Sequence, residues 1–293
     1  MDNVQSGILE PTPPVARYLT FSLTDEDEAR RSLRLLSNIA DGRQTVVGLG
    51  QSLVRTLGAT IPGLCTAPSY AGSGYEVPST PYALWCWLRG DDRGELVHRT
   101  RRIHEVLAPA FRLEQVIDAF TYGEGRDLTG YEDGTENPKG ERASEVAFVQ
   151  GQDEGLNGST CVAVQQWVHD LDRFEAKSIQ EQDHTIGRRR SDNEEIGDAP
   201  PSAHIKRTAQ ESFDPEAFVL RRSMPWTDGC RAGLVFVAFG ASFDPFDALL
   251  RRMVGAEDGI VDALFSFTRP ISGAFFWCPG MYEGRLDLRL LSV

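Results

Sequence analysis

The sequence predicts an α+β fold built from two successive βαββαβ units. Apolar, strand-like runs alternate with helix-like segments, and the same order occurs before and after an acidic, glycine-rich stretch at 127–138. The 293 residues, of which 41% are hydrophobic, can form the core of one large domain or of two domains of ordinary size. The repeated order favours two.

In the first half, the predicted strands and helices follow the order βαββαβ at 15–23, 24–40, 46–50, 82–88, 94–107 and 111–122. Residues 24–28 offer an N-cap and early acids for the first helix. The strand at 82–88 is apolar throughout, as a strand covered on both faces would be. Leu96, Ile103 and Leu107 have the spacing of a buried helix face, whereas the Gly/Pro/Ser-rich stretch 67–81 predicts a long loop.

The second half repeats this order, with two helical segments instead of one after its first strand. Its predicted strands and helices lie at 160–168, 171–177, 178–186, 218–222, 233–240, 243–254 and 273–277. Two such units imply two ferredoxin-like domains with antiparallel sheets, packed side by side. We place these domains at 1–140 and 141–293. The acidic stretch falls where they join.

The stretch 127–138, called the acidic loop below, contains four acids: Asp127, Glu132, Asp133 and Glu136. Its glycines and its proline require repeated turns. Composition alone favours a solvated turn, since turns are rich in Asp, Asn and Gly. Its place between two domains favours a functional site, because ligands often bind at domain junctions.

Composition excludes several classes of protein. The net charge of −13 argues against general binding to nucleic acid or to anionic membranes. No apolar run reaches the ~18 residues of a membrane span, and residues 1–6 do not resemble a signal peptide, so we expect a cytoplasmic protein. The five cysteines are widely spaced and form no C-x-x-C pair; Cys86 and Cys161 lie in apolar runs and are expected to be core residues.

Among the histidines, His98 and His104 are expected to be exposed on a charged helix. His169 is expected to form a surface ion pair with Asp170 or Asp172, and His184 to do so with its neighbouring acids Glu181 and Asp183. His204 differs, because it follows an uncharged stretch at 199–203 and precedes Lys206 and Arg207. No pair has zinc-chelating spacing on a convincing helix, but one axial histidine is enough for a haem iron.

Four motifs, taken in chain order, resemble the signature of the dye-decolourising peroxidases. They are Gly130-x-x-Asp133-Gly134 with its continuation to Pro138, then Ile186-Gly187-Arg188, then His204, and finally the run from Leu220 to Trp226. The opening Gln5-Ser6-Gly7-Ile8-Leu9 is similar to the compact bacterial branch, class B/P-like. The resemblance spans nearly the whole chain. It implies haem b in the C-terminal half, hydrogen peroxide as oxidant and a homo-oligomer, a dimer or larger.

The resemblance also implies roles for individual residues. His204 would be the proximal iron ligand, and Asp262 the carboxylate that accepts a hydrogen bond from its imidazole. The resemblance implies that Asp133 and Arg221 lie on the other side of the iron, with Ser223 nearby. The residues expected to hold or surround the cofactor are Arg188, Arg207, Phe236, Gly134 and Thr135.

Peroxide chemistry needs such residues. A carboxylate at Asp133 can move a proton if it is ionised, and a guanidinium beside it favours the ionised form, so we expect highest activity at acidic pH. Arg221 keeps its charge and can stabilise negative charge on the cleaving peroxide. Arg221 could instead pair with a neighbouring acid, and Phe236 could be ordinary core. Trp226, Trp277 and Tyr131 could be core or could relay electrons to the surface.

We therefore expect a haem peroxidase that reduces hydrogen peroxide and oxidises phenolic, dye-like or porphyrin-type donors in one-electron steps. One alternative is a haem-binding or haem-handling protein with incidental peroxidase activity. Another is a cofactor-free ferredoxin-like regulatory dimer, which explains the fold but not Asp133, His204 and Arg221.

Overall fold

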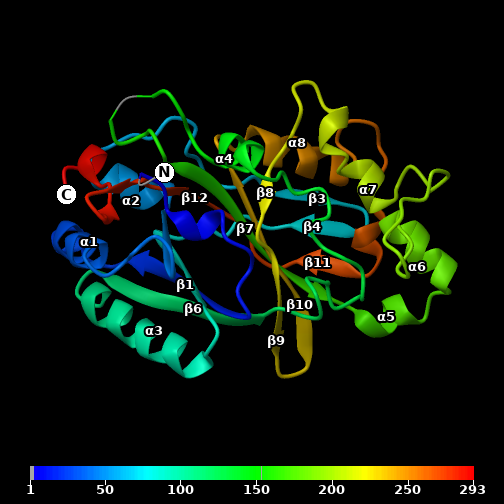
Figure 1. The fold of residues 1–293 in the computed structure, drawn as a ribbon, viewed down its shortest axis with the longest axis horizontal. Helices are drawn as coiled ribbons and strands as arrows, with labels where there is room; N and C mark the ends of the chain where they lie inside the picture. Colours follow the sequence, from blue (N-terminus) through cyan, green and yellow to red (C-terminus); the bar gives the residue numbers. More distant parts are fainter. Residues whose placement is uncertain (1–2, 153) are drawn as a thin grey trace.

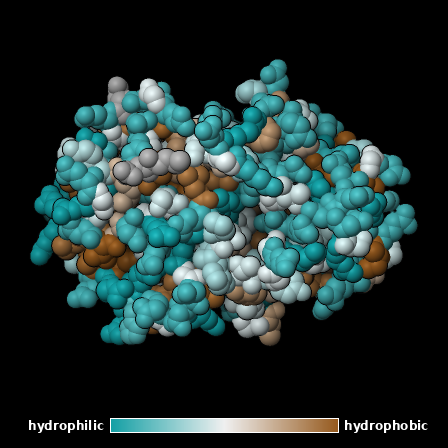
Figure 2. Space-filling model, in the orientation of Figure 1, coloured by the Kyte–Doolittle hydropathy of each residue, from teal (hydrophilic) through white to brown (hydrophobic). Residues whose placement is uncertain are grey.

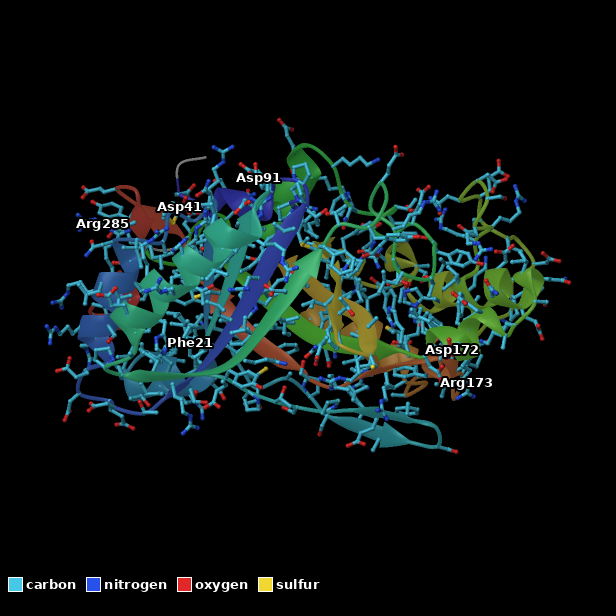
Figure 3. All side chains as sticks on the ribbon, turned by 90° about the horizontal axis from the view of Figure 1, so that it is seen from below. Phe21, Asp41, Asp91, Asp172, Arg173 and Arg285 are labelled. Atoms are coloured by element: carbon cyan, nitrogen blue, oxygen red, sulfur yellow. The ribbon has the colours of Figure 1, made fainter. Side chains whose placement is uncertain are left out.

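The computed structural model describes residues 3–152 and 154–293, and its two halves lie side by side along the long axis (Figure 1). Asp41 and Arg285 lie towards one end of the molecule, and Asp172 and Arg173 towards the other (Figure 3). The predicted α+β, duplicated ferredoxin-like fold is confirmed. The boundary between residues 140 and 141 stays a prediction, and Met1 and Asp2 of the first predicted domain lie outside the described residues.

The N-terminal half forms an antiparallel sheet in the order β2-β5-β1-β6. Its elements are β1 (Val15–Leu23), α1 (Ala29–Ser37), β2 (Thr45–Leu49), α2 (Gln51–Thr56), β5 (Leu84–Gly90), α3 (Arg93–Leu107) and β6 (Phe111–Phe120), preceded by the short 3-10 helix η1 (Ser6–Ile8). The predicted face of α3 is buried, since Leu96, Ile103 and Leu107 are at most 1% exposed. The first helix begins later than predicted, because the Thr24 hydroxyl donates to the Ala110 carbonyl instead of capping it.

The C-terminal half repeats the arrangement, with the order β12-β7-β10 and then β9 and β8 on the far side of β10. Its elements are α4 (Glu141–Ala147), β7 (Thr160–His169), α5 (Leu171–Glu175), α6 (Ile179–Ile186), α7 (His204–Arg207), η2 (Gln210–Ser212), β8 (Leu220–Arg221), β9 (Met224–Asp228), β10 (Arg231–Gly240), α8 (Asp244–Met253), η3 (Ala263–Ser266), β11 (Thr268–Pro270), β12 (Ala274–Cys278), β13 (Met281–Tyr282), β14 (Arg285–Leu286) and η4 (Arg289–Leu291).

The two sheets join at both edges into a closed ring. β12 pairs with β2 through Trp277 and Leu49, and β9 pairs with β6 through Trp226 and Ala119. Strand side chains alternate between the two faces of the ring. One cluster of buried side chains, including Trp85, lies on one face, and another, including Cys86, lies under the helices. This explains why the strand at 82–88 is apolar throughout, and it confirms Cys86 and Cys161 as buried core residues.

The stretch 67–81 is not a plain loop, since it contains the hairpin β3 (Tyr70–Gly72) and β4 (Tyr75–Val77). The hairpin belongs to the N-terminal half in sequence but lies against the C-terminal half (Figures 1 and 3). The Tyr70 hydroxyl donates to Asp247 of α8 at 3.1 Å, and the Tyr75 ring lies 5.4 Å from that of Phe265. The hairpin therefore fastens the halves together.

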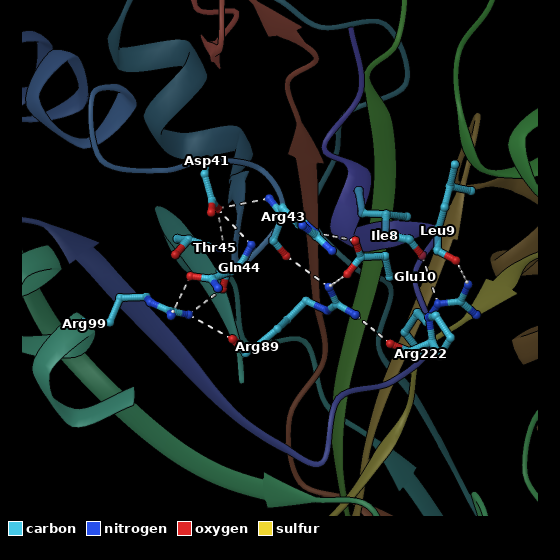
Figure 4. Close-up of polar contacts among 11 residues, drawn as sticks. Ile8, Leu9, Glu10, Asp41, Arg43, Gln44, Thr45, Arg89, Arg99 and Arg222 are labelled. Atoms are coloured by element: carbon cyan, nitrogen blue, oxygen red, sulfur yellow. Dashed lines mark hydrogen bonds and ion pairs between the residues drawn. The ribbon is translucent and has the colours of Figure 1, made fainter. Parts of the chain in front are cut away.

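Two arginines, the buried Arg89 and the partly buried Arg222, hold the N-terminal segment against the ring (Figure 4). Arg222 donates from Nε to the carbonyl of Ile8 at 2.9 Å and from Nη2 to that of Leu9 at 2.8 Å. Arg89 binds the carboxylate of Glu10 at 2.8 Å and the carbonyl of Pro11 at 2.6 Å. Burial, together with the nearby charge of Arg89, lowers the pKa of Arg222 to about 10, so this guanidinium is still charged at neutral pH.

The face shown in Figure 2 is mainly hydrophilic, with small hydrophobic patches. Among the described residues, none of the helices combines the length and the apolar character needed to cross a bilayer.

Candidate functional site

A cavity of about 530 Å³, called the main cavity below, lies in the C-terminal half between the acidic loop, β7, β10, α7 and α8. Its apolar walls come mostly from one face of α8 and from the segment around η3; they include Phe246, Leu249, Leu250, Met253, Leu264 and Phe267. Polar groups enter it from the acidic loop, β7 and α7. Its volume lies within the range of sites that bind cofactors and other small molecules.

Two neighbouring strands supply one wall of the main cavity. Side chains two residues apart on a strand point to the same face, so Gln165, Trp167 and His169 of β7 all reach the cavity. Phe236 pairs in register with Gln165, and Leu234 with Trp167, so these β10 side chains line it too. Phe236 also contacts the ring of Phe246, with ring centroids 5.8 Å apart. The predicted placement of Phe236 in a ligand site agrees with this geometry.

His204 reaches the main cavity from the first residue of α7. Its Nδ1 lies 2.7 Å from Oδ2 of Asp262, whose side chain is completely buried. The other carboxylate oxygen of Asp262 accepts the Leu264 backbone N–H at 2.8 Å and caps η3. When Nδ1–H donates to Asp262, Nε2 carries the free lone pair that can bind a metal.

Asp133 and Arg221 come together at the main cavity from distant parts of the sequence. Nη2 of Arg221 lies 3.2 Å from Oδ1 of Asp133, and both side chains are about one-fifth exposed. Both residues also border a second, smaller chamber of about 190 Å³, called the side chamber below. The ion pair therefore stands between two spaces. The side chamber is closed on one side by Pro11 and Thr12 of the anchored N-terminal segment.

The acidic loop owes its shape to glycines and to a partner loop. Gly130 and Gly134 have φ values of 87° and 76°, a region that side chains rarely adopt. Asn193 donates from its amide to Glu132 at 2.8 Å and to the Thr135 hydroxyl at 2.9 Å. The loop is thus ordered by hydrogen bonds rather than merely solvated.

The other predicted cofactor residues divide between the two spaces. Arg188 and Thr135 line the main cavity, and Nη2 of Arg188 pairs with Glu136 at 2.6 Å. Gly134 and Ser223 border the side chamber. The structure therefore brings these four residues to the site, but on different sides of the Asp133 and Arg221 pair.

Arg207 is not brought to either space. Its side chain is 5% exposed, and its guanidinium binds both oxygens of Asp258 at 2.8 Å. Nη2 also donates to the Arg252 carbonyl at 2.7 Å, near the C-terminus of α8. A carboxylate and a helix C-terminus together satisfy a buried guanidinium well. The predicted contact of Arg207 with the cofactor does not agree with this placement.

The prediction for His169 is wrong. Its side chain is only 6% exposed and pairs through Nε2 with Asp127 at 3.0 Å, while Nδ1 lies 2.6 Å from the hydroxyl of Thr268. Asp170, the predicted partner, instead caps α5 by accepting the Arg173 N–H. The alternation of β7 was the missed signal, because it places residue 169 on the same face as residues 165 and 167.

The remaining predictions for polar and aromatic residues had mixed outcomes. His98 and His104 are exposed, as expected. The acids next to His184 have other partners, because Glu181 forms a capping box with Ser178 and Asp183 accepts the Tyr131 hydroxyl at 2.5 Å. Trp226, Trp277 and Tyr131 are at most 4% exposed, which agrees with core positions; the electron relay stays a prediction.

We expect Asp127→Asn to destabilise the protein by about 1–3 kcal/mol at neutral pH, because it removes the charged acceptor of a buried histidine. Burial raises the pKa of Asp127, but hydrogen bonds and the charge of His169 outweigh it and hold the pKa below its ordinary value. Because the pKa of Asp127 is lower in the folded than in the unfolded protein, where it is about 3.9, the ionised carboxylate stabilises the fold above that pH. This stabilisation is lost as the pH falls through the pKa of Asp127 in the folded protein.

Urea unfolding at several pH values checks this prediction. The difference between wild type and Asp127→Asn should be large near neutral pH and should shrink below about pH 4. Glu124→Gln is a matched control, since Glu124 is an exposed acid just before the acidic loop. Equal stability of Asp127→Asn and wild type at neutral pH would contradict the prediction.

Comparison with known proteins gives a consistent result. Residues 124–283 match the family model described as "Dyp-type peroxidase, C-terminal". The dye-decolorizing peroxidase of Mycolicibacterium paratuberculosis is 27% identical over 93% of this chain and 82% of that protein. A putative dyp-type peroxidase structure from Shewanella oneidensis is 28% identical, with a TM-score of 0.89, over 99% of this chain and 98% of that chain.

A third similarity concerns the fold alone. A variant of Rhodococcus jostii DypB, solved in complex with heme, superposes with a TM-score of 0.86 at 24% identity, over 93% of this chain and 94% of that chain.

Proposed function

The chain belongs to the Dyp-type peroxidase family, and on that premise we propose that it binds haem b in the main cavity through His204. It is thus a peroxidase, an enzyme that reduces hydrogen peroxide at the expense of an electron donor. The observation that carries the proposal is that the main cavity joins the His204 and Asp262 pair to the Asp133 and Arg221 pair.

The residues of the main cavity fit a haem. A porphyrin needs a flat space with apolar walls and one strong axial donor. Aromatic and aliphatic side chains of β10 and α8 supply such walls, and Nε2 of His204 supplies the donor. Arg188 and Lys206 also line the cavity and would face carboxylate groups of the cofactor. Bound haem supplies an iron that exchanges electrons with peroxide and donor.

Beside His204, Asp262 determines how the imidazole is presented to the iron. Its Oδ2 accepts from Nδ1–H and so fixes both the tautomer and the orientation of the ring. Its second oxygen is held by the Leu264 N–H, so the carboxylate cannot turn away. A carboxylate in this position makes the imidazole a stronger donor, which favours a more oxidised metal.

At the other pair, Asp133 and Arg221 would have different roles towards peroxide. Oδ1 of Asp133 is paired with Arg221, which leaves Oδ2 to take a proton from one peroxide oxygen and return it to the other. The guanidinium of Arg221 stabilises the negative charge that develops as the O–O bond breaks. Ser223 borders the side chamber with both residues, and we place it beside the path of peroxide to them.

The reaction balances with two donors for each peroxide. One hydrogen peroxide takes up two electrons and two protons and becomes two water molecules. Each donor gives one electron, so phenolic, dye-like or porphyrin-type donors fit as substrates. The choice among them, a homo-oligomeric state, a cytoplasmic location and the class B/P-like branch remain predictions from the sequence.

Reconstitution with haemin tests this function. The loaded protein should oxidise a phenolic dye only with peroxide present, with two dye molecules oxidised for each peroxide and much faster than free haemin at equal concentration. A protein that binds haemin stoichiometrically but reacts no faster than free haemin would support the alternative, a haem-handling protein with incidental activity.

A further inference from the structure

We propose that Asn137 is a positioning residue that fixes Arg221 at the peroxide side of the main cavity. The inference rests on the proposed function, in which Arg221 stabilises the cleaving peroxide. Asn137 holds the backbone of Arg221, whereas Asp133 pairs with the Arg221 side chain.

Arg221 lies on β8, the last strand in the order of its sheet. The next residue, Arg222, donates its N–H to the Val237 carbonyl of β10 at 2.8 Å. Hydrogen bonds of an antiparallel pair alternate between neighbouring residues, so the N–H and C=O of Arg221 point away from β10, towards the open edge. An edge strand needs partners for these groups.

The side-chain amide of Asn137 supplies both partners. Its Oδ1 accepts the Arg221 N–H at 2.8 Å, and its Nδ2 donates to the Arg221 carbonyl at 3.0 Å. The amide thereby replaces a residue of a neighbouring strand. Arg222 also donates to this carbonyl, at 3.1 Å, but only Asn137 accepts the N–H among the hydrogen bonds of the described residues.

One tight turn connects this contact to Asp133. The Asn137 N–H donates to the Gly134 carbonyl at 3.0 Å, which places Asn137 beside Gly134 and one step from Asp133. A Cβ at Gly134 would lie 2.7 Å from Nδ2 of Asn137, so the turn leaves no room for a side chain there. Asp133, just before the turn, holds the guanidinium of Arg221, and Asn137 at the end of the turn holds the backbone of Arg221.

Other contacts keep the acidic loop in place without Asn137. The buried amide of Gln210 bridges the carbonyl of Glu136 and the N–H of Val219, at 3.2 and 2.9 Å. Arg188 binds the carboxylate of Glu136 at 2.6 Å. Loss of the Asn137 amide should therefore release Arg221 while the loop and the fold persist.

The test uses Asn137→Ala in the haem-loaded protein. Equilibrium binding of fluoride reports on hydrogen-bond donors near the iron and needs no turnover. We expect the fluoride affinity of the variant to fall about tenfold, which corresponds to the loss of about one hydrogen bond to a charged group. We also expect kcat/KM for peroxide to fall about 10- to 100-fold, with kcat for the donor at saturating peroxide retained, since later steps do not use Arg221.

Asp118→Asn is the control for a general loss of stability. It weakens the ion pair between Asp118 of β6 and Arg17 of β1, at 2.7 Å, in the N-terminal half of the molecule. This variant should keep the wild-type fluoride affinity and kcat/KM for peroxide even if its Tm falls as much as that of Asn137→Ala. Equal losses in both variants, or no loss in Asn137→Ala, would overturn the inference. Failure of the wild-type protein to bind haem would instead refute the proposed function.

Discussion

His204→Ala is expected to abolish stable haem binding. The imidazole is the axial donor proposed for the iron, and alanine offers no atom that can replace Nε2. The apolar walls would still attract a porphyrin weakly, so the expected result is a large loss of affinity and not a small shift. Haemin titration followed by gel filtration measures it: wild type should carry one haem per chain with a Soret band near ~400 nm, and the variant almost none.

His98→Ala controls for loss of a histidine in general. His98 is exposed on α3, in the other half of the molecule, so its variant should bind haemin as wild type does. A Soret spectrum and a haem content in His204→Ala that match wild type would show that another residue ligates the iron.

Arg221→Leu is expected to lower kcat/KM for peroxide by about 10²–10³ while haem stays bound. Leucine fills similar space but cannot stabilise the charge on the cleaving peroxide. Stopped-flow mixing of the haem-loaded variant with peroxide measures this loss directly. An unchanged rate would remove Arg221 from the mechanism.

Asp133→Asn completes that experiment, because it keeps the shape of the pair and removes the proton acceptor. It should slow the peroxide reaction or change its pH dependence, with haem still bound. Glu132→Gln is the matched control: Glu132 is the adjacent acid, but it pairs with Arg126 at 3.1 Å and with Asn193. Its variant should react nearly as fast as wild type.

The fold could be predicted well where local pattern decides it. Strand β1 has the predicted bounds, 15–23, and the wholly apolar run around Trp85 is covered on both faces. Ring closure could not be foreseen, since each junction rests on one residue pair, Trp277 with Leu49 or Trp226 with Ala119. A single backbone pairing leaves no sequence pattern.

Two side-chain pairings of the candidate site could be predicted from the ordered motifs, whereas the roles of these residues stay proposals. Asp133 pairs with Arg221, and His204 pairs with Asp262. The resemblance to a known family predicts that these residues meet although they are far apart in the sequence, whereas their spacing alone does not. Arg207 could not be placed, since its partner Asp258 is 51 residues away. The contact of Asn137 could not be predicted, because its side chain bonds the backbone of Arg221, and composition does not indicate such contacts.

His169 shows a different kind of error. The sequence predicts an ion pair with the acids that follow it, Asp170 or Asp172, but the alternation of the strand turns the His169 side chain towards the main cavity. Its real partner, Asp127, is 42 residues away and lies in the acidic loop. All four acids of that loop line the main cavity; Asp127 has a structural role there, through its pair with His169, and Asp133 has the proposed chemical one.

A crystal structure of the haem-loaded protein tests the central claim most directly. The account predicts one haem in the main cavity, with the iron bonded to Nε2 of His204, and with Asp133 and Arg221 on the opposite face of the porphyrin. A haem bound elsewhere, or an iron ligated by a residue other than His204, would contradict it.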